Sequence, residues 1–202
     1  MRIKLYEENP NKREIMRIAA LLKEGGIIIY PTDTVYAMGC DALNIKAVEK
    51  ICKIKGINPQ KSNLSIICPN LSNISEYARV SNPAFKLMKR NLPGPFTFIL
   101  DATNSLPRIY KNRKEVGIRV PDNKIILSLT EELGNPILTT SVRDKDDFLE
   151  YCTDPEQIEE EYGNIVDIVV DGGYGGLEPS TVIDCTEEEI EIIRQGKGVL
   201  IE

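Results

Sequence analysis

An arginine inside an apolar strand is the residue of this 202-residue chain that most clearly points to chemistry. Arg119 lies in the run 116–120, whose other members are apolar or glycine. A buried arginine normally has an anionic partner, so Arg119 is interpreted as a functional residue. Three hydroxyl side chains, Thr32, Ser141 and Thr181, follow or begin other apolar runs. Each of them could bind a ligand or could simply cap a turn or a strand end.

The chain contains no histidine, and this absence excludes several classes of enzyme. Ser-His-Asp and Cys-His nucleophile activation and histidine-based zinc sites all require an imidazole. No carboxylate cage for a metal is recognisable either, so no protein metal ligands are predicted.

Composition and length predict one soluble domain over residues 1–202, with a net charge of −6 and 42% hydrophobic residues. The five cysteines form no CxxC pair, which favours reduced thiols and a cytoplasmic location. No apolar run approaches the roughly 20 residues of a membrane span, so no membrane association is expected.

The charge is distributed unevenly along the chain. Residues 1–124 carry 21 Lys/Arg against 11 Asp/Glu, a balance of +10, whereas residues 125–202 carry 4 against 20, a balance of −16. The first part of the chain is therefore the candidate for binding anions, unless its lysines only cover solvated helix faces.

Apolar periodicity alternates between strand and helix types, which predicts an α/β fold. Helices are expected from about Pro10 to Gly25 and at 45–53, from Ser81, at 124–133 and at 155–161. Strands are expected near Ile3 and at 27–30, 64–68, 96–100, 116–120, 137–140, 165–170, 181–184 and 190–194. Residues 104–115 and 143–154 are interpreted as exposed loops, and the glycine-rich segment 172–176 as a turn.

Seven motifs occur in order along residues 14–200, and together they make the chain recognisable. They are GIIIYPTDTVYAMG (26–39), KIK (53–55), PGPFTFIL (93–100), GIRVPD (117–122), TTS (139–141), PSTVID (179–184) and IRQGKG (193–198). The series resembles the YrdC/YciO family, the threonylcarbamoyl-AMP synthase-like proteins. The resemblance implies an open, twisted, mixed β-sheet with helices on its faces and a concave basic cavity.

Family enzymes condense L-threonine, bicarbonate and ATP into threonylcarbamoyl-adenylate with release of pyrophosphate, which supplies the modification of an adenosine in tRNA. The resemblance therefore implies a nucleotidyltransferase that uses ATP with Mg²⁺ and works with tRNA-modification proteins. It places Lys53 and Lys55 on the phosphates as catalytic residues. It assigns the substrate to Thr32, Arg119, Thr139 and Thr181, and the nucleotide to Lys53, Ser141 and Arg194.

This reaction suits a chain without histidine. The carbamate oxygen attacks the α-phosphorus of ATP in line, and negative charge develops on the phosphoryl oxygens. The protein must supply position and cationic side chains rather than a nucleophile. Lys53, Lys55, Arg119 and Arg194 are the residue types that this requires.

Three departures from the family pattern resemble the YciO branch. Lys55 replaces an arginine, Arg143 replaces an asparagine, and Glu115 stands where Thr or Ser is common. A lysine lacks the two-pronged donor of arginine. Glu115 in the cavity would repel a triphosphate unless it is paired with Arg143 or Lys114, and a solvent-exposed position is favoured for it.

The departures keep two other functions open. One is a YciO-like protein that binds double-stranded RNA or a nucleotide without synthase activity. The other is a transferase that uses a different amino acid or acyl acceptor.

Overall fold

The computed structural model describes residues 1–58, 64–107, 114–143, 151–187 and 189–201. Helices and strands alternate along the first half of the chain: β1 (Arg2–Lys4), α1 (Lys12–Lys23), β2 (Ile28–Tyr30), β3 (Ala37–Asp41), α2 (Ile45–Ile54), β4 (Ser65–Ile67), the 3-10 turn η1 (Leu71–Asn73), α3 (Ile74–Tyr77), β5 (Ala78–Arg79) and α4 (Asn82–Asn91). The second half continues with β6 (Phe96–Ala102), β7 (Glu115–Arg119), α5 (Lys124–Leu133), β8 (Ile137–Ser141), α6 (Pro155–Tyr162), β9 (Ile168–Asp171), β10 (Thr181–Asp184) and β11 (Glu191–Arg194).

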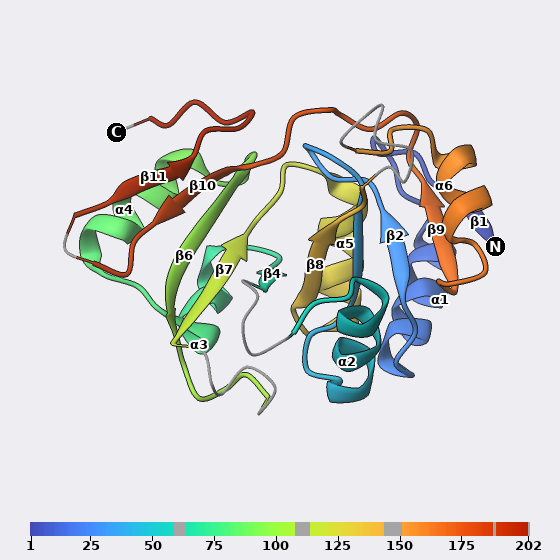
Figure 1. Ribbon diagram of the computed structural model, residues 1–202, viewed down its shortest axis with the longest axis horizontal. Helices are drawn as coiled ribbons and strands as arrows, with labels where there is room; N and C mark the ends of the chain where they lie inside the picture. Colours follow the sequence, from blue (N-terminus) through green and yellow to red (C-terminus); the bar gives the residue numbers. More distant parts are fainter. Residues whose placement is uncertain (59–63, 108–113, 144–150, 188, 202) are drawn as a thin grey trace.

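All the described strands join one open, mixed sheet in the order β1-β9-β2-β3-β8-β4-β7-β6-β10-β11, and β5 pairs with β6 beside this path. The central strands combine both directions, since β4 is parallel to β7 and antiparallel to β8. Figure 1 shows that the strands β6, β7, β10 and β11 lie at one side of the molecule and β2, β9 and β1 at the other. The sheet does not close, so one of its faces is available for a cavity.

Helices cover the sheet and bury its apolar side chains in two clusters. Helices α1 and α5 pack together through Ile18, Leu22 and Leu129, against Ile28 and Tyr30 of β2. The other cluster places Val48 and Ile51 of α2 against the opposite side chains of β2 and β3. Because both faces of β2 are buried, its sequence is a continuous apolar run rather than an alternating one.

The predicted α/β alternation is confirmed, and α5 has the predicted bounds. Asn11, Asn44, Ser81, Asn123 and Asp154 cap helices through side-chain oxygens that accept backbone N–H bonds, which explains why these helices start where they do. The segment 172–176 lies outside helices and strands, as predicted. Large parts of the two predicted loops, 108–113 and 144–150, lie outside the described residues.

The sequence analysis missed the strand β3, which follows the Pro-Thr-Asp-Thr segment. All five of its residues are buried, so no polar alternation marks it, and Gly39 interrupts the apolar run. Gly39 is needed there because a β-carbon would overlap the carbonyl oxygen of Leu138 on β8. Among the described residues, no helix is long and apolar enough to cross a membrane.

Candidate functional site

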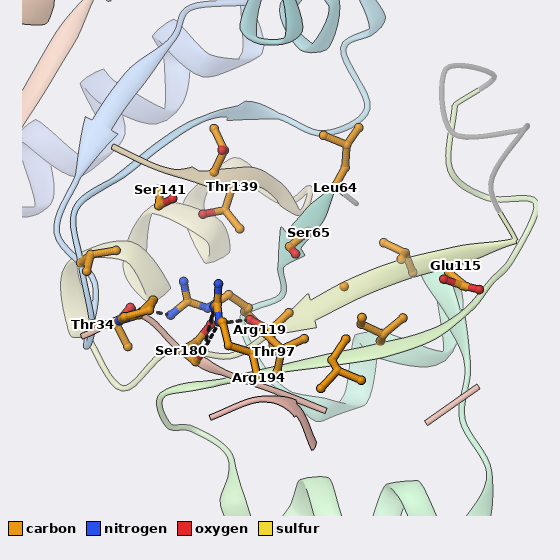
Figure 2. A pocket seen from close by; sticks show the side chains of 18 residues that line it. Thr34, Leu64, Ser65, Thr97, Glu115, Arg119, Thr139, Ser141, Ser180 and Arg194 are labelled. Atoms are coloured by element: carbon orange, nitrogen blue, oxygen red, sulfur yellow. Dashed lines mark hydrogen bonds between the residues drawn. The ribbon is translucent and has the colours of Figure 1, made fainter. Parts of the chain in front are cut away.

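A cavity of about 370 Å³ lies on the sheet face formed by β4, β6, β7, β8, β10 and β11, beside the loop that follows β2 (Figure 2). Its polar lining consists mainly of hydroxyl groups, together with two arginines and one glutamate. The side chains that carry this chemistry are Thr34, Ser65, Thr97, Glu115, Arg119, Thr139, Thr140, Ser141, Ser180 and Arg194. Strand alternation explains part of this lining, because Glu115, Gly117 and Arg119 are every second residue of β7.

The floor of the cavity is a row of small residues on three neighbouring strands. Ser65 of β4 is directly opposite Thr139 of β8 and Gly117 of β7. A β-carbon at Gly117 would overlap the Ser65 hydroxyl and press on Thr97. Only glycine therefore keeps the floor open between the two ends of β7.

Arg119 lies at one end of this floor and is only 6% exposed. Its Nη2 donates to Asp33 Oδ1 at 3.1 Å and to Thr34 Oγ1 at 3.1 Å. Burial lowers the pKa of Arg119, Asp33 opposes this change, and the nearby Arg194 adds to it. The Asp33 carboxylate thus explains how a guanidinium is kept inside the fold.

One donor of Arg119 is left without a partner. Its Nε is buried and makes no hydrogen bond within the described part of the chain. An unsatisfied buried donor costs about 1–3 kcal/mol, more when it is charged, so this position calls for an explanation such as strain or a functional role. Together with Arg194, Arg119 gives the lining two cationic side chains, which favours an anionic or acceptor-rich ligand.

Arg194 reaches the same end of the cavity because of an irregularity in β11. The register changes from Val182 opposite Arg194 to Ile183 opposite Ile192, which leaves Ile193 as an extra, bulged residue. As a result Ile193 and Arg194 both line the cavity. The Arg194 guanidinium is anchored by the carbonyl of Ser180, at 2.7 Å from Nη2 and 3.3 Å from Nε.

Hydroxyl groups line the wall beside the two arginines. The buried Tyr30 donates to Thr139 Oγ1 at 2.9 Å, and Thr97 and Ser180 share a hydrogen bond of 2.8 Å. Burial raises the pKa of Tyr30, so its phenol stays neutral and keeps this donor in place. These bonds fix the orientation of the hydroxyl groups, which are then ready to donate to or accept from a ligand.

Four of the predicted site residues are brought together here: Arg119, Thr139, Ser141 and Arg194. Lys53 and Lys55 do not line the cavity. Lys53 is exposed in the last turn of α2, and the half-buried Lys55 donates to the carbonyl of Ser141 at 3.0 Å. Burial lowers the pKa of Lys55, and Arg143 adds to this effect. Their predicted roles on phosphates stay predictions.

Thr32 and Thr181 also lie outside the lining of this cavity. Thr32 Oγ1 donates to the carbonyl of Val35 at 2.7 Å and accepts from Thr34 N at 3.0 Å, so it shapes the loop from which Thr34 reaches the cavity. Thr181 is fully buried and donates to the carbonyl of Gly198 at 2.7 Å. These contacts match the turn and strand-end roles that the sequence left open, and the substrate roles predicted for Thr32 and Thr181 stay predictions.

Sequence reasoning missed Thr34, Ser65, Thr97 and Ser180, which all line the cavity. Ser180 and Thr97 belong to the quoted motifs; strand alternation predicts that Ser180 and Thr181 face opposite sides, but not which side carries the cavity. Glu115 is exposed, as favoured, and it also lines the cavity. Ser65 lies in no quoted motif, and nothing before the fold indicates it.

This arrangement can bind and position an anion. The described lining contains no lysine and no cysteine, and no group of three or more possible metal ligands occurs among the described residues. What it offers is two guanidinium groups and fixed hydroxyls, which stabilise charge without forming a covalent bond.

Comparison with known proteins identifies the family. The Sua5/YciO/YrdC family model, described as "Telomere recombination", matches residues 20–196. The chain belongs to the Sua5/YciO/YrdC family. It is 41% identical over 197 residues to YciO of Escherichia coli strain K12, an uncharacterized protein, covering 96% of this chain and 94% of YciO.

Solved and named relatives within the Sua5/YciO/YrdC family agree with the fold. The crystal structure of E. coli YciO has a TM-score of 0.91 and 39% identity and covers 98% of this chain and 97% of its own. The putative threonylcarbamoyl-AMP synthase of Methanocaldococcus jannaschii is 36% identical over 199 residues, covering 96% of this chain and 92% of the relative. P. abyssi Sua5, solved in complex with L-threonine, has a TM-score of 0.86 and 28% identity over 97% of this chain and 57% of the Sua5 chain.

Proposed function

We propose that this protein condenses L-threonine, bicarbonate and ATP into threonylcarbamoyl-adenylate, with release of pyrophosphate. The observation that carries the proposal is the buried Arg119, whose Nε has no partner among the described residues, next to Arg194 in a hydroxyl-lined cavity. Further support comes from two relatives, which are named putative threonylcarbamoyl-AMP synthase in M. jannaschii and threonylcarbamoyl-AMP synthase in Bacillus subtilis. The structure of P. abyssi Sua5 in complex with L-threonine adds to this support.

The proposed reaction has two steps. The threonine amine reacts with bicarbonate to give a carbamate and water. A carbamate oxygen then bonds to the α-phosphorus of ATP while the bond to the bridging oxygen of pyrophosphate breaks. Negative charge increases on the phosphoryl oxygens in this second step, and Arg119 and Arg194 are the cations in the cavity that would stabilise it.

The fixed hydroxyls would orient the two reactants. Thr139 is held by Tyr30, and Ser180 by Thr97, so neither has to be reoriented when a substrate binds. Such positioning lowers the barrier because the entropy of alignment is already lost in the folded protein. ATP would enter with Mg²⁺, and the product would pass to the proteins that modify tRNA.

Pyrophosphate release from ATP, measured with and without L-threonine and bicarbonate, tests this proposal. We expect release that requires both co-substrates. Arg194→Gln should lower the rate by about 100-fold or more, since it removes a charge that acts on the transition state. Arg194 is exposed, so the variant should stay folded. Release that is independent of threonine, or unchanged by Arg194→Gln, would contradict the proposal.

The variant Lys53→Ala tests whether Lys53, in the last turn of α2, contacts the phosphates as the family resemblance predicts. It removes a cation from an exposed position outside the cavity. Loss of turnover in the folded variant would support the role that the family resemblance assigns to Lys53. Unchanged turnover would restrict the reaction to the cavity residues.

A second candidate function is binding without synthesis. The observation that favours it is the engagement of Lys55 by the Ser141 carbonyl, which leaves the cavity with arginines but without either predicted phosphate lysine. Duplex RNA affinity that falls steeply with salt, without adenylate formation, would support this candidate, because several phosphates would then release counterions. A flat salt response would contradict it.

A further inference from the structure

The two ends of the cavity carry opposite charges. Arg119, Gly117 and Glu115 alternate along the same face of β7, so the arginine and the glutamate are about 13 Å apart along the strand at roughly 3.3 Å per residue. Arg194 joins Arg119 at the first end, and Figure 2 shows Glu115 at the far end of β7 from both arginines. Gly117, which has no side chain, lies between the two ends, next to the Ser65 hydroxyl.

The carboxylate of Glu115 is not neutralised by the described residues. Its carboxylate makes no ion pair or hydrogen bond with them, and its neighbour Lys114 points to the opposite face by strand alternation. The residue directly opposite Glu115 on β6 is Asp101, a second carboxylate on the same face. Like charges in directly opposed positions destabilise a sheet, so this end of the cavity favours a positive charge. Arg79 on β5 is opposite Asp101, on the side away from Glu115.

The other end independently indicates a ligand. Arg119 is buried, lines the cavity, and keeps its Nε without a partner in the described part of the chain. Phosphate oxygens are suitable acceptors for the guanidinium groups of Arg119 and Arg194, which line this end of the cavity. A ligand that satisfies both ends is therefore anionic near Arg119 and cationic near Glu115.

ATP alone does not meet both requirements, because phosphates that extend towards Glu115 would be repelled by it. Mg²⁺ on those phosphates reverses the sign of this interaction, and Mg²⁺ in nucleotide sites is commonly held by one or two carboxylates together with substrate phosphates. We propose that Glu115 makes the cavity selective for the magnesium complex of ATP and holds the cation on the phosphates. This inference rests on the proposed function for the identity of the nucleotide.

Calorimetric titration of the full chain with a non-hydrolysable ATP analogue tests the inference, with Mg²⁺ or with EDTA at constant ionic strength. The variants are Glu115→Gln, which removes the charge, and Glu115→Asp, which keeps it. Glu131→Gln is the matched control, since Glu131 is exposed on α5 and does not line the cavity.

We expect Mg²⁺ to strengthen binding of the analogue to the wild type about tenfold more than to Glu115→Gln. The reason is that the wild-type carboxylate attracts the cation at close range. In EDTA, Glu115→Gln should bind the analogue more tightly than the wild type does. Glu115→Asp and Glu131→Gln should keep a strong response to Mg²⁺.

An equal response to Mg²⁺ in the wild type and Glu115→Gln overturns the inference and leaves the proposed function intact. A loss of affinity in Glu115→Gln that is the same with and without Mg²⁺ also overturns it, because the carboxylate would then contact the nucleotide itself. No binding of the analogue to any variant in either buffer would contradict the proposed function together with the inference.

Discussion

At the scale of single residues, the pair Arg119 and Asp33 decides how the cavity keeps its charge. Both side chains are 8% exposed, and Asp33 Oδ2 also accepts from the backbone N–H of Asp122 at 3.0 Å. The pair lets a guanidinium face a ligand without being free to move. A buried charge that loses its partner is costly, which makes this pair testable by stability.

Arg119→Met should lower the free energy of unfolding by about 3–5 kcal/mol, because the buried Asp33 carboxylate loses its cation. Asp33→Asn should have a comparable effect, and the double variant should cost less than the sum of the two. Urea unfolding followed by circular dichroism measures all three. A loss below about 1 kcal/mol for Arg119→Met, the range of a surface pair, would show that the pair is not needed.

At the scale of elements, the side of a strand on which a hydroxyl lies decides whether it lines the cavity or hydrogen-bonds to the backbone of a neighbouring segment. On β10, Val182 lines the cavity, as does Ser180 just before the strand, whereas Thr181 points away from it. Thr181 Oγ1 donates to the Gly198 carbonyl and accepts from the Gly196 N–H at 3.0 Å, which holds the segment that follows β11. That segment begins directly after Arg194, the last residue of β11.

Thr181→Val should destabilise the protein by about 1 kcal/mol, since the half-buried Gly196 N–H loses its acceptor while the Gly198 carbonyl keeps the side-chain amide of Gln195. Nucleotide affinity should be unchanged in the folded variant, because Thr181 does not line the cavity. Chemical unfolding and calorimetric binding together make the measurement. Unchanged stability with weakened binding would instead favour the substrate contact that the family resemblance assigns to Thr181.

At the scale of the whole molecule, the loop after β2 is held by segments far away in the sequence. Tyr36 donates to the Gly173 carbonyl at 2.6 Å and accepts from the Gly172 N–H at 3.1 Å. The Gly176 N–H donates to the Thr34 carbonyl at 2.8 Å, an approach that a β-carbon on Gly176 would prevent. Lys197 donates to the Asp33 carbonyl at 2.6 Å. The cavity therefore depends on both halves of the chain.

Stability at alkaline pH should reflect Tyr36. Burial raises the pKa of Tyr36 from 10.0 to about 12. Between these values the unfolded chain releases the proton and the folded protein retains it, so the stabilisation is complete below pH 10 and decreases as the pH rises to about 12. The wild type should therefore lose stability relative to Tyr36→Phe over this range in pH-dependent urea unfolding. If the free energy of unfolding of the wild type minus that of Tyr36→Phe stays constant or increases from pH 10 to about 12, the assignment is contradicted.

The sequence by itself determined the α/β class, most of the elements, and the family. Periodicity and caps are local, so the bounds of α5 and the start of α4 at Ser81 could be predicted from short segments. Ordered motifs also named four of the cavity residues, and the apolar strand around Arg119 explained why that residue needs an anion. These inferences depend only on neighbours along the chain.

Only the tertiary structure decided which side chains share the cavity. Strand order and register bring Ser65, Thr139 and Gly117 together from three distant segments, and the bulge at Ile193 brings Arg194 beside Arg119. The same register directs Thr181 towards the Gly198 carbonyl, away from the cavity, and places Glu115 opposite Asp101. A shift of one residue reverses the face of a strand, and pairing between distant segments sets that register, so no local pattern could have fixed these positions.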